Sequence, residues 1–146
     1  MSKTLIKNGV IVPMDGKTRT IEKKALLIED NRIAAIDSEE TLVKEHSIDQ
    51  TIDARGKVVM PGFVNAHAHL TWTSLVRGIA EDKSVEQYIF ELSTPLDQFV
   101  LTDDDYPCFS RLSCVEMLRF GNTCISAFES VSDKMASVVA DSGIRG

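Results

Sequence analysis

The pattern of hydrophobic and polar positions changes near Lys57, and this change predicts two regions. Before Lys57, short apolar runs alternate with turn residues, which is typical of a small β-sheet or sandwich. The pair Asn8-Gly9 between two apolar runs predicts a two-residue hairpin. Residues 37–46 differ, because their polar start and apolar spacing predict a short helix. We therefore assign residues 1–57 to a β-sandwich-like segment.

The second region, residues 58–146, alternates apolar strands with helical patterns. The run VVMPGFVNA, which begins at Val58, predicts a strand buried on both faces. Helical patterns cover residues 84–92, 102–120 and 132–143, and the strand NTCISAF separates the last two. For the middle helix we expect a core-facing stripe of Phe109, Leu112, Val115 and Leu118. Strands that alternate with helices indicate parallel βα units, so the fold class is α/β.

Composition and charge exclude several classes of protein. The 146 residues are 43% hydrophobic and 26% charged, which is enough to form a core and a polar surface. The net charge of −6, with acidic and basic residues interleaved, argues against a nucleic-acid partner and against a basic membrane anchor. No apolar stretch has the length of a membrane span, and the N-terminus does not resemble a signal peptide. Three cysteines without C-x-x-C spacing indicate reduced thiols and a cytoplasmic location.

Two histidines stand one residue apart where the apolar run from Val58 ends. Side chains alternate across a strand, so His67 and His69 would point to the same side. In a β/α barrel the carboxyl ends of the strands carry the active site, and neutral imidazole is the commonest metal ligand. A bare H-x-H is more often an ordinary pair of loop residues. Here its place at the end of a buried strand favours a metal site.

The stretch DARGKVVMPGFVNAHAHL, residues 53–70, resembles the first barrel strand of the amidohydrolase superfamily. LVRGIAED, TPLDQFVLTDDD and EMLRFGNT resemble its branch of adenosine-type deaminases and triazine or guanine aminohydrolases, above all 5-methylthioadenosine/S-adenosylhomocysteine deaminases. The resemblance implies part of a β-sandwich over residues 1–57. Residues 58–146 would then form a partial TIM-type (β/α)8 barrel, from strand 1 to the start of strand 3. A complete barrel takes about 250 residues, so we expect a truncated chain, the N-terminal third of such an enzyme.

The resemblance also implies a metal-dependent aminohydrolase that acts on a C–N bond of a purine-type or related heterocycle. A divalent metal, with zinc as the first candidate, would activate a water, and a carboxylic acid would pass its proton to the leaving ammonia. The superfamily's third histidine ligand, its acid–base glutamate and its later catalytic histidine and aspartate have no counterpart in this sequence. We therefore expect no catalytic residue in this chain and only half of the metal site.

Two further residues are candidates for substrate binding, Asp97 through the same resemblance and Trp72 through the stacking ability of its ring. Asp97 matches a glutamate of the adenosine-type deaminases that contacts ribose hydroxyls, and an ordinary exposed carboxylate is the alternative. Trp72 could stack on the ring of the substrate or pack against a helix. Leu70 and Thr71 follow the second histidine where dihydroorotase-like members carry an arginine, which argues against that branch.

The alternative function is a non-catalytic remnant or subunit that requires a complementing chain. An apolar barrel strand that lacks one neighbour exposes unpaired backbone groups, and such edges pair with other chains. We therefore expect self-association or a complementing C-terminal chain as partner. A small heterocyclic substrate would bind only to the completed site.

Overall fold

The computed structural model describes residues 2–129 and 132–146, and its fold is mixed α/β as the sequence predicts. The chain divides into two compact units, Met1–Pro61 and Gly62–Gly146. The division falls after Pro61 and not after Lys57, because Val58 and Val59 pair with a strand of the first unit. In the part of the chain that the structure describes, no helix is both long enough and apolar enough to cross a membrane.

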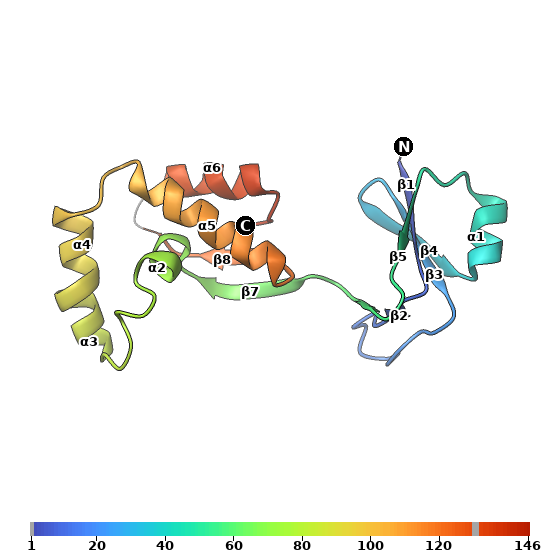
Figure 1. Cartoon of the computed structure of the whole chain (residues 1–146), viewed down its shortest axis with the longest axis horizontal. Coiled ribbons are helices and arrows are strands. Elements are labelled where there is room, and N and C mark those ends of the chain that lie inside the picture. The colour runs from blue at the N-terminus through green and yellow to red at the C-terminus, as the bar shows by residue number, and fades with distance from the viewer. Residues whose placement is uncertain (1, 130–131) are drawn as a thin grey trace. The chain divides into compact units, whose positions relative to one another are not determined.

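The first unit is built on a four-stranded sheet (Figure 1). Its elements are β1 Lys3–Lys7, β3 Ala25–Glu29, β4 Arg32–Asp37, α1 Glu39–Glu45 and β5 Gln50–Asp53. The strand order is β4-β3-β1-β5; β1 pairs antiparallel with β3 and parallel with β5. Helix α1 begins after Ser38, whose side chain accepts a hydrogen bond from the Thr41 N–H. Leu42 of this helix packs with Leu5 and Leu27 of the sheet to form the core.

The turn at Asn8-Gly9 does not close the predicted hairpin. After the turn, β2 (Val10–Ile11) pairs in parallel with β6 (Val58–Val59), in a two-stranded sheet separate from that of β1. A Cβ added to Gly9 would lie 2.8 Å from Cγ2 of Val59, so this position requires glycine. The sequence therefore marks a true turn, but the turn leads the chain from one sheet into another.

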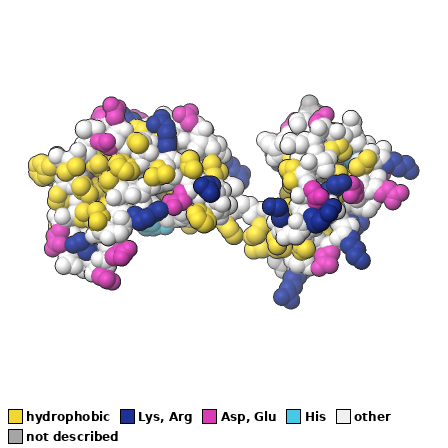
Figure 2. All heavy atoms as spheres, viewed as in Figure 1, with side chains coloured by type: hydrophobic (Ala, Val, Ile, Leu, Met, Phe, Trp, Pro, Cys, Tyr) yellow, Lys and Arg dark blue, Asp and Glu magenta, His cyan; other side chains and the backbone are white. Residues whose placement is uncertain are grey.

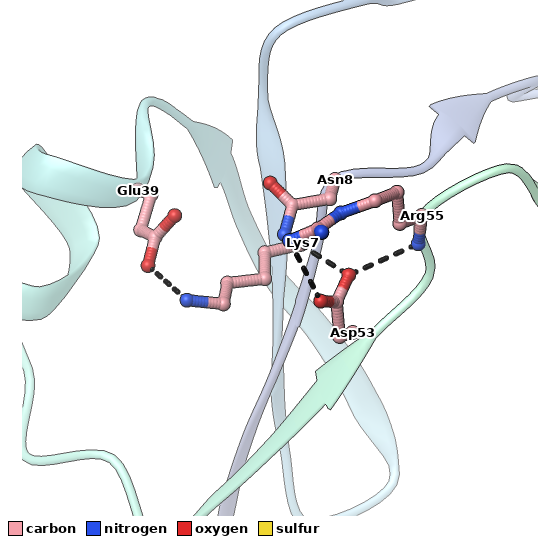
Figure 3. Close-up of polar contacts among 5 residues, drawn as sticks. All are labelled: Lys7, Asn8, Glu39, Asp53 and Arg55. Carbon is pink, nitrogen blue, oxygen red and sulfur yellow. Dashed lines mark hydrogen bonds and ion pairs between the residues drawn. The ribbon is translucent and has the colours of Figure 1, made fainter.

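Hydrogen bonds and ion pairs between surface side chains stabilise the same turn (Figure 3). The Asp53 carboxylate accepts hydrogen bonds from the Asn8 side-chain amide at 3.0 Å and from the Arg55 backbone N–H at 3.0 Å. The Arg55 guanidinium lies 3.3 Å from the second carboxylate oxygen, and Lys7 pairs with Glu39 at 2.6 Å. The hydrogen bond from Asn8, followed by that from Arg55, lowers the pKa of the Asp53 carboxyl.

The second unit combines two parallel strands with helices (Figure 1). Its elements are β7 Phe63–Ala68, α2 Leu70–Leu75, α3 Val85–Gln87, the π-helix η1 Tyr88–Ser93, α4 Thr94–Phe99, α5 Asp105–Arg119, β8 Asn122–Ala127 and α6 Ser132–Ser142. β7 pairs in parallel with β8, and α5 packs against both α2 and α6. Leu70, Cys114, Ile125 and Val138 join these elements in one buried core. The parallel strands with a helix between them follow the order that the sequence predicts.

Helix α5 buries a different face from the one that its apolar residues predict. Three of the four residues expected in the core are exposed: Leu112, Val115 and Leu118. The buried face instead carries Ser110 and Ser113, whose hydroxyls lie 3.0 Å from Thr71 Oγ1 and 2.6 Å from Ser74 Oγ on α2. Small side chains allow the two helices to approach closely, and the paired hydroxyls satisfy each other's hydrogen bonds. Hydropathy alone cannot recognise such a face.

Strand β7 is much less buried than its apolar sequence predicts. Phe63 is 52% exposed and Val64 is 69% exposed. Within the described residues β7 pairs with β8 alone, so its second edge has no neighbouring strand to cover it. Other apolar side chains also lie at the surface of this unit, and Figure 2 shows them gathered over α4 and along α5. An apolar run thus predicts a strand, but its burial depends on neighbours that the run does not specify.

Candidate metal centre

His67 and His69 bring their rings together at the carboxyl end of β7. Their Nε2 atoms lie 3.0 Å apart, and their ring centroids are 5.0 Å apart. The pairing of β7 with β8 shifts register between Asn65 and Ala68, which places an irregularity at His67. Irregularities of this kind re-aim side chains and are frequent beside active sites. The structure therefore brings together the two side chains that strand alternation places on one side.

The His69 ring is held by the segment that follows β8. Its Nδ1 lies 2.8 Å from the backbone oxygen of Phe128. A carbonyl oxygen can only accept, so Nδ1 carries the proton and donates it to this hydrogen bond. In a neutral imidazole the other nitrogen, Nε2, then carries a lone pair, which faces Nε2 of His67 and can accept a hydrogen bond from it. Metal-binding histidines are usually oriented through their second nitrogen in this way.

The pair suits a divalent metal in chemistry and in spacing. A tetrahedral zinc with Zn–N bonds of about 2.0–2.1 Å separates its ligand nitrogens by about 3.3 Å, close to the 3.0 Å between the two Nε2 atoms. Catalytic zinc sites usually have three protein ligands. Within residues 2–129 and 132–146, no cluster of three His, Cys, Asp or Glu side chains could hold a metal ion. The described residues thus offer two facing imidazole nitrogens, fewer than the three protein ligands that are usual for catalytic zinc.

Glu129 lies beside this pair and was not found from the sequence. Its Oε1 accepts a hydrogen bond from the backbone N–H of Leu70, the residue after His69. Its Oε2 is buried and has no hydrogen-bond partner among the described residues. Burial raises the pKa of the Glu129 carboxyl, and the hydrogen bonds from Leu70 and Thr71 oppose this rise. The available signal was a carboxylate directly after a strand, where parallel strands place their site residues.

Asp97 and Trp72 lie on two other helices of the same unit, α4 and α2. The Asp97 Oδ1 accepts a hydrogen bond from the Tyr106 hydroxyl at 2.5 Å. Burial, followed by this hydrogen bond, raises the pKa of Tyr106 to about 12. Trp72 is buried. In the described part of the chain no hydrogen bond joins either side chain to the histidine pair, so their roles in substrate binding stay predictions.

The histidine pair lies within a segment that matches a known protein family. Residues 50–94 match the model described as the Amidohydrolase family. The predicted resemblance to the amidohydrolase superfamily is confirmed. A 5'-deoxyadenosine deaminase of Methanosarcina mazei is 35% identical over 145 residues, which cover 99% of this chain and 32% of that protein. A 5-methylthioadenosine/S-adenosylhomocysteine deaminase of Acetivibrio thermocellus is 34% identical over 141 residues, with 97% and 32% covered.

Solved structures give the same relationship. An adenosine deaminase from Xanthomonas campestris with bound zinc matches with a TM-score of 0.81 at 26% identity, over 96% of this chain and 32% of that protein. A triazine hydrolase variant matches with a TM-score of 0.86 at 24% identity, over 99% of this chain and 34% of that protein, and shows the fold alone. The chain spans about a third of the length of the curated relatives it matches.

Proposed function

We propose that this chain supplies two metal ligands, His67 and His69, to a metal-dependent hydrolase that deaminates a purine-type or related heterocycle. The observation that carries the proposal is the facing pair of Nε2 atoms, 3.0 Å apart, at the end of β7. The deaminase names of the relatives support this reaction and class of substrate. The zinc bound in the Xanthomonas campestris structure supports zinc as the metal.

For the architecture, we infer that the first unit is part of a β-sandwich and that the second forms the first βα units of a TIM-type barrel. The parallel pair β7 and β8, with α5 between them in sequence, supports this arrangement. After α6, Arg145 forms a parallel bridge with Cys124 of β8, where a third barrel strand would begin. His69 and Glu129 then lie at the carboxyl ends of neighbouring strands, the active-site end of such barrels.

Different residues of this chain would bind the metal and the substrate. A divalent metal, once bound, would supply Lewis-acid chemistry and the activation of a water for the hydrolysis. His67 and His69 would hold it through Nε2, and the Phe128 carbonyl keeps the proton of His69 on Nδ1. Asp97 would accept substrate hydroxyls, with its carboxylate oriented by Tyr106, and Trp72 would wall the ring.

Zinc binding by the 146-residue chain tests the proposal. Isothermal titration with zinc chloride should show one site per chain, and the site should be weak because only two ligands are present. The double variant H67A/H69A should lose this site. H46A is the matched control, because it removes the remaining histidine, which ends helix α1 in the first unit. H46A should bind zinc as the unchanged chain does.

Two outcomes would count against the proposal. If H67A/H69A kept its zinc, the metal would sit elsewhere, with the cysteine thiols as the next candidates. If the unchanged chain bound no zinc at millimolar protein concentration, with its fold verified by circular dichroism, the pair would not be a metal site.

A further inference from the structure

Phe128 and Glu129, the two residues that follow β8, form hydrogen bonds with His69 and with the residues on either side of it. The Phe128 N–H donates to the Ala68 carbonyl at 3.1 Å, and the Phe128 carbonyl accepts from the His69 Nδ1–H at 2.8 Å. The Glu129 carboxylate accepts from the Leu70 N–H. These contacts span three consecutive residues at the end of β7, and only one of them is to the ring itself.

We propose that Glu129 is a positioning residue, which sets the place of His69 by holding the backbone at Leu70. The inference rests on the proposed metal site, to which it adds a residue that orients a ligand without binding the metal. Groups that orient metal ligands influence affinity through the geometry they impose.

The first argument concerns the start of helix α2. His69 is its N-cap, with φ −130° and ψ 97°, but its side chain makes no capping hydrogen bond. The first N–H groups of a helix have no acceptor within the helix and need one from elsewhere. Glu129 provides that acceptor for Leu70, and a carboxylate at this end also interacts favourably with the helix dipole. His69 is therefore free to use its ring for a metal because another residue caps the helix.

The second argument concerns how firmly Leu70 is fixed. Its side chain is fully buried in the core, and its carbonyl accepts a hydrogen bond from the Ser113 hydroxyl at 2.5 Å. Glu129 holds the opposite side of the residue, at the N–H that adjoins His69. Of these restraints, the one from Glu129 acts on the peptide unit that His69 and Leu70 share. Loosening it moves the histidine backbone and with it Nε2.

Zinc affinity in two conservative variants tests the proposal. E129Q keeps the length of the side chain and an acceptor oxygen, so its zinc affinity should stay within about threefold of the unchanged chain. E129D keeps the charge but is one methylene shorter and cannot reach Leu70. Its affinity should fall about tenfold or more, the range typical for groups that orient metal ligands. E40A, which removes an exposed acid of α1 in the first unit, is the control and should bind zinc normally.

A second measurement reads His69 without any metal. Nitrogen NMR of the imidazole rings should show the His69 proton on Nδ1 in the unchanged chain and in E129Q, and a mixture of tautomers in E129D. Unchanged zinc affinity in E129D would overturn the proposal, because the hydrogen bond to Leu70 would then not matter. An equal loss of affinity in E129Q would also overturn it, because the charge of Glu129 and not its length would then matter. Failure of the unchanged chain to bind zinc would instead refute the proposed function, and the tautomers would still decide the role of Glu129.

Discussion

Replacing Gly62 by alanine should destabilise the second unit, because the new methyl group has no space. Gly62 immediately precedes β7, and a Cβ built on it would lie 2.2 Å from Oγ1, 2.3 Å from Cγ2 and 2.7 Å from Cβ of Thr123. Gly62 does not have a positive φ, so an alanine could adopt its backbone conformation without strain. The penalty is therefore steric, and its three nearest contacts all come from Thr123 on β8.

The expected magnitude follows from these three contacts. Overpacking of this kind typically costs about 1–3 kcal/mol. Thr123→Ala removes Oγ1 and Cγ2, the two nearest atoms, but leaves the contact at 2.7 Å. G62A should thus lower the free energy of unfolding by about 1–3 kcal/mol alone and by clearly less in the T123A background. The difference is the coupling energy, for which residues in direct contact give about 0.5–3 kcal/mol.

Urea unfolding of the four chains of this double-mutant cycle measures the effect. The single tryptophan, Trp72, lies in the second unit, so its fluorescence follows the unfolding of that unit. G16A is the control: a Cβ there meets no atom within 4 Å, and the strain that its positive φ of 74° imposes on alanine falls in the first unit. It should leave the tryptophan transition unchanged. Equal destabilisation by G62A with and without Thr123 would refute the steric explanation.

Two further predictions concern titration. The lowered pKa of Asp53 stabilises the fold above the ordinary value of about 3.9, and this is lost as the pH falls through the folded-state pKa. The stability difference between the unchanged chain and D53N in urea unfolding should therefore shrink in acid, and a pH-independent difference would contradict this. Tyr106 should deprotonate near pH 12 in an ultraviolet absorbance titration. D97N should lower that pKa only in part, because burial is the larger cause; a full return to about 10 would disprove the ranking.

The elements that the sequence predicts correctly have local causes. Ser38 caps α1, and Ser84 with Gln87 forms a capping box that begins α3. Gly121 and Gly143 follow α5 and α6 with positive φ, as helix stops do. The histidine pair is local too, because strand alternation alone places two residues at i and i+2 on one side.

The features that the sequence misses depend on contacts between distant segments. Nothing near Asn8 indicates that the strand after it will pair with Val58 and Val59. The buried face of α5 includes two serines whose hydroxyls contact α2, and Glu129 joins the site only because the segment after β8 returns to Leu70. Self-association and a complementing chain stay predictions, which sedimentation over a concentration series would measure.

The two histidines of the pair are held very differently, and this difference has a consequence for metal binding. His69 is fixed through Nδ1 by Phe128 and is followed by the fully buried Leu70, whereas His67 is exposed and lies on the exposed strand β7. Among the described residues, its ring makes one hydrogen bond, to Nε2 of His69. A ligand that is already oriented loses less conformational entropy on binding. His69 is thus the anchored half of the pair, and any packing that orders His67 on β7 would strengthen metal binding without touching the metal.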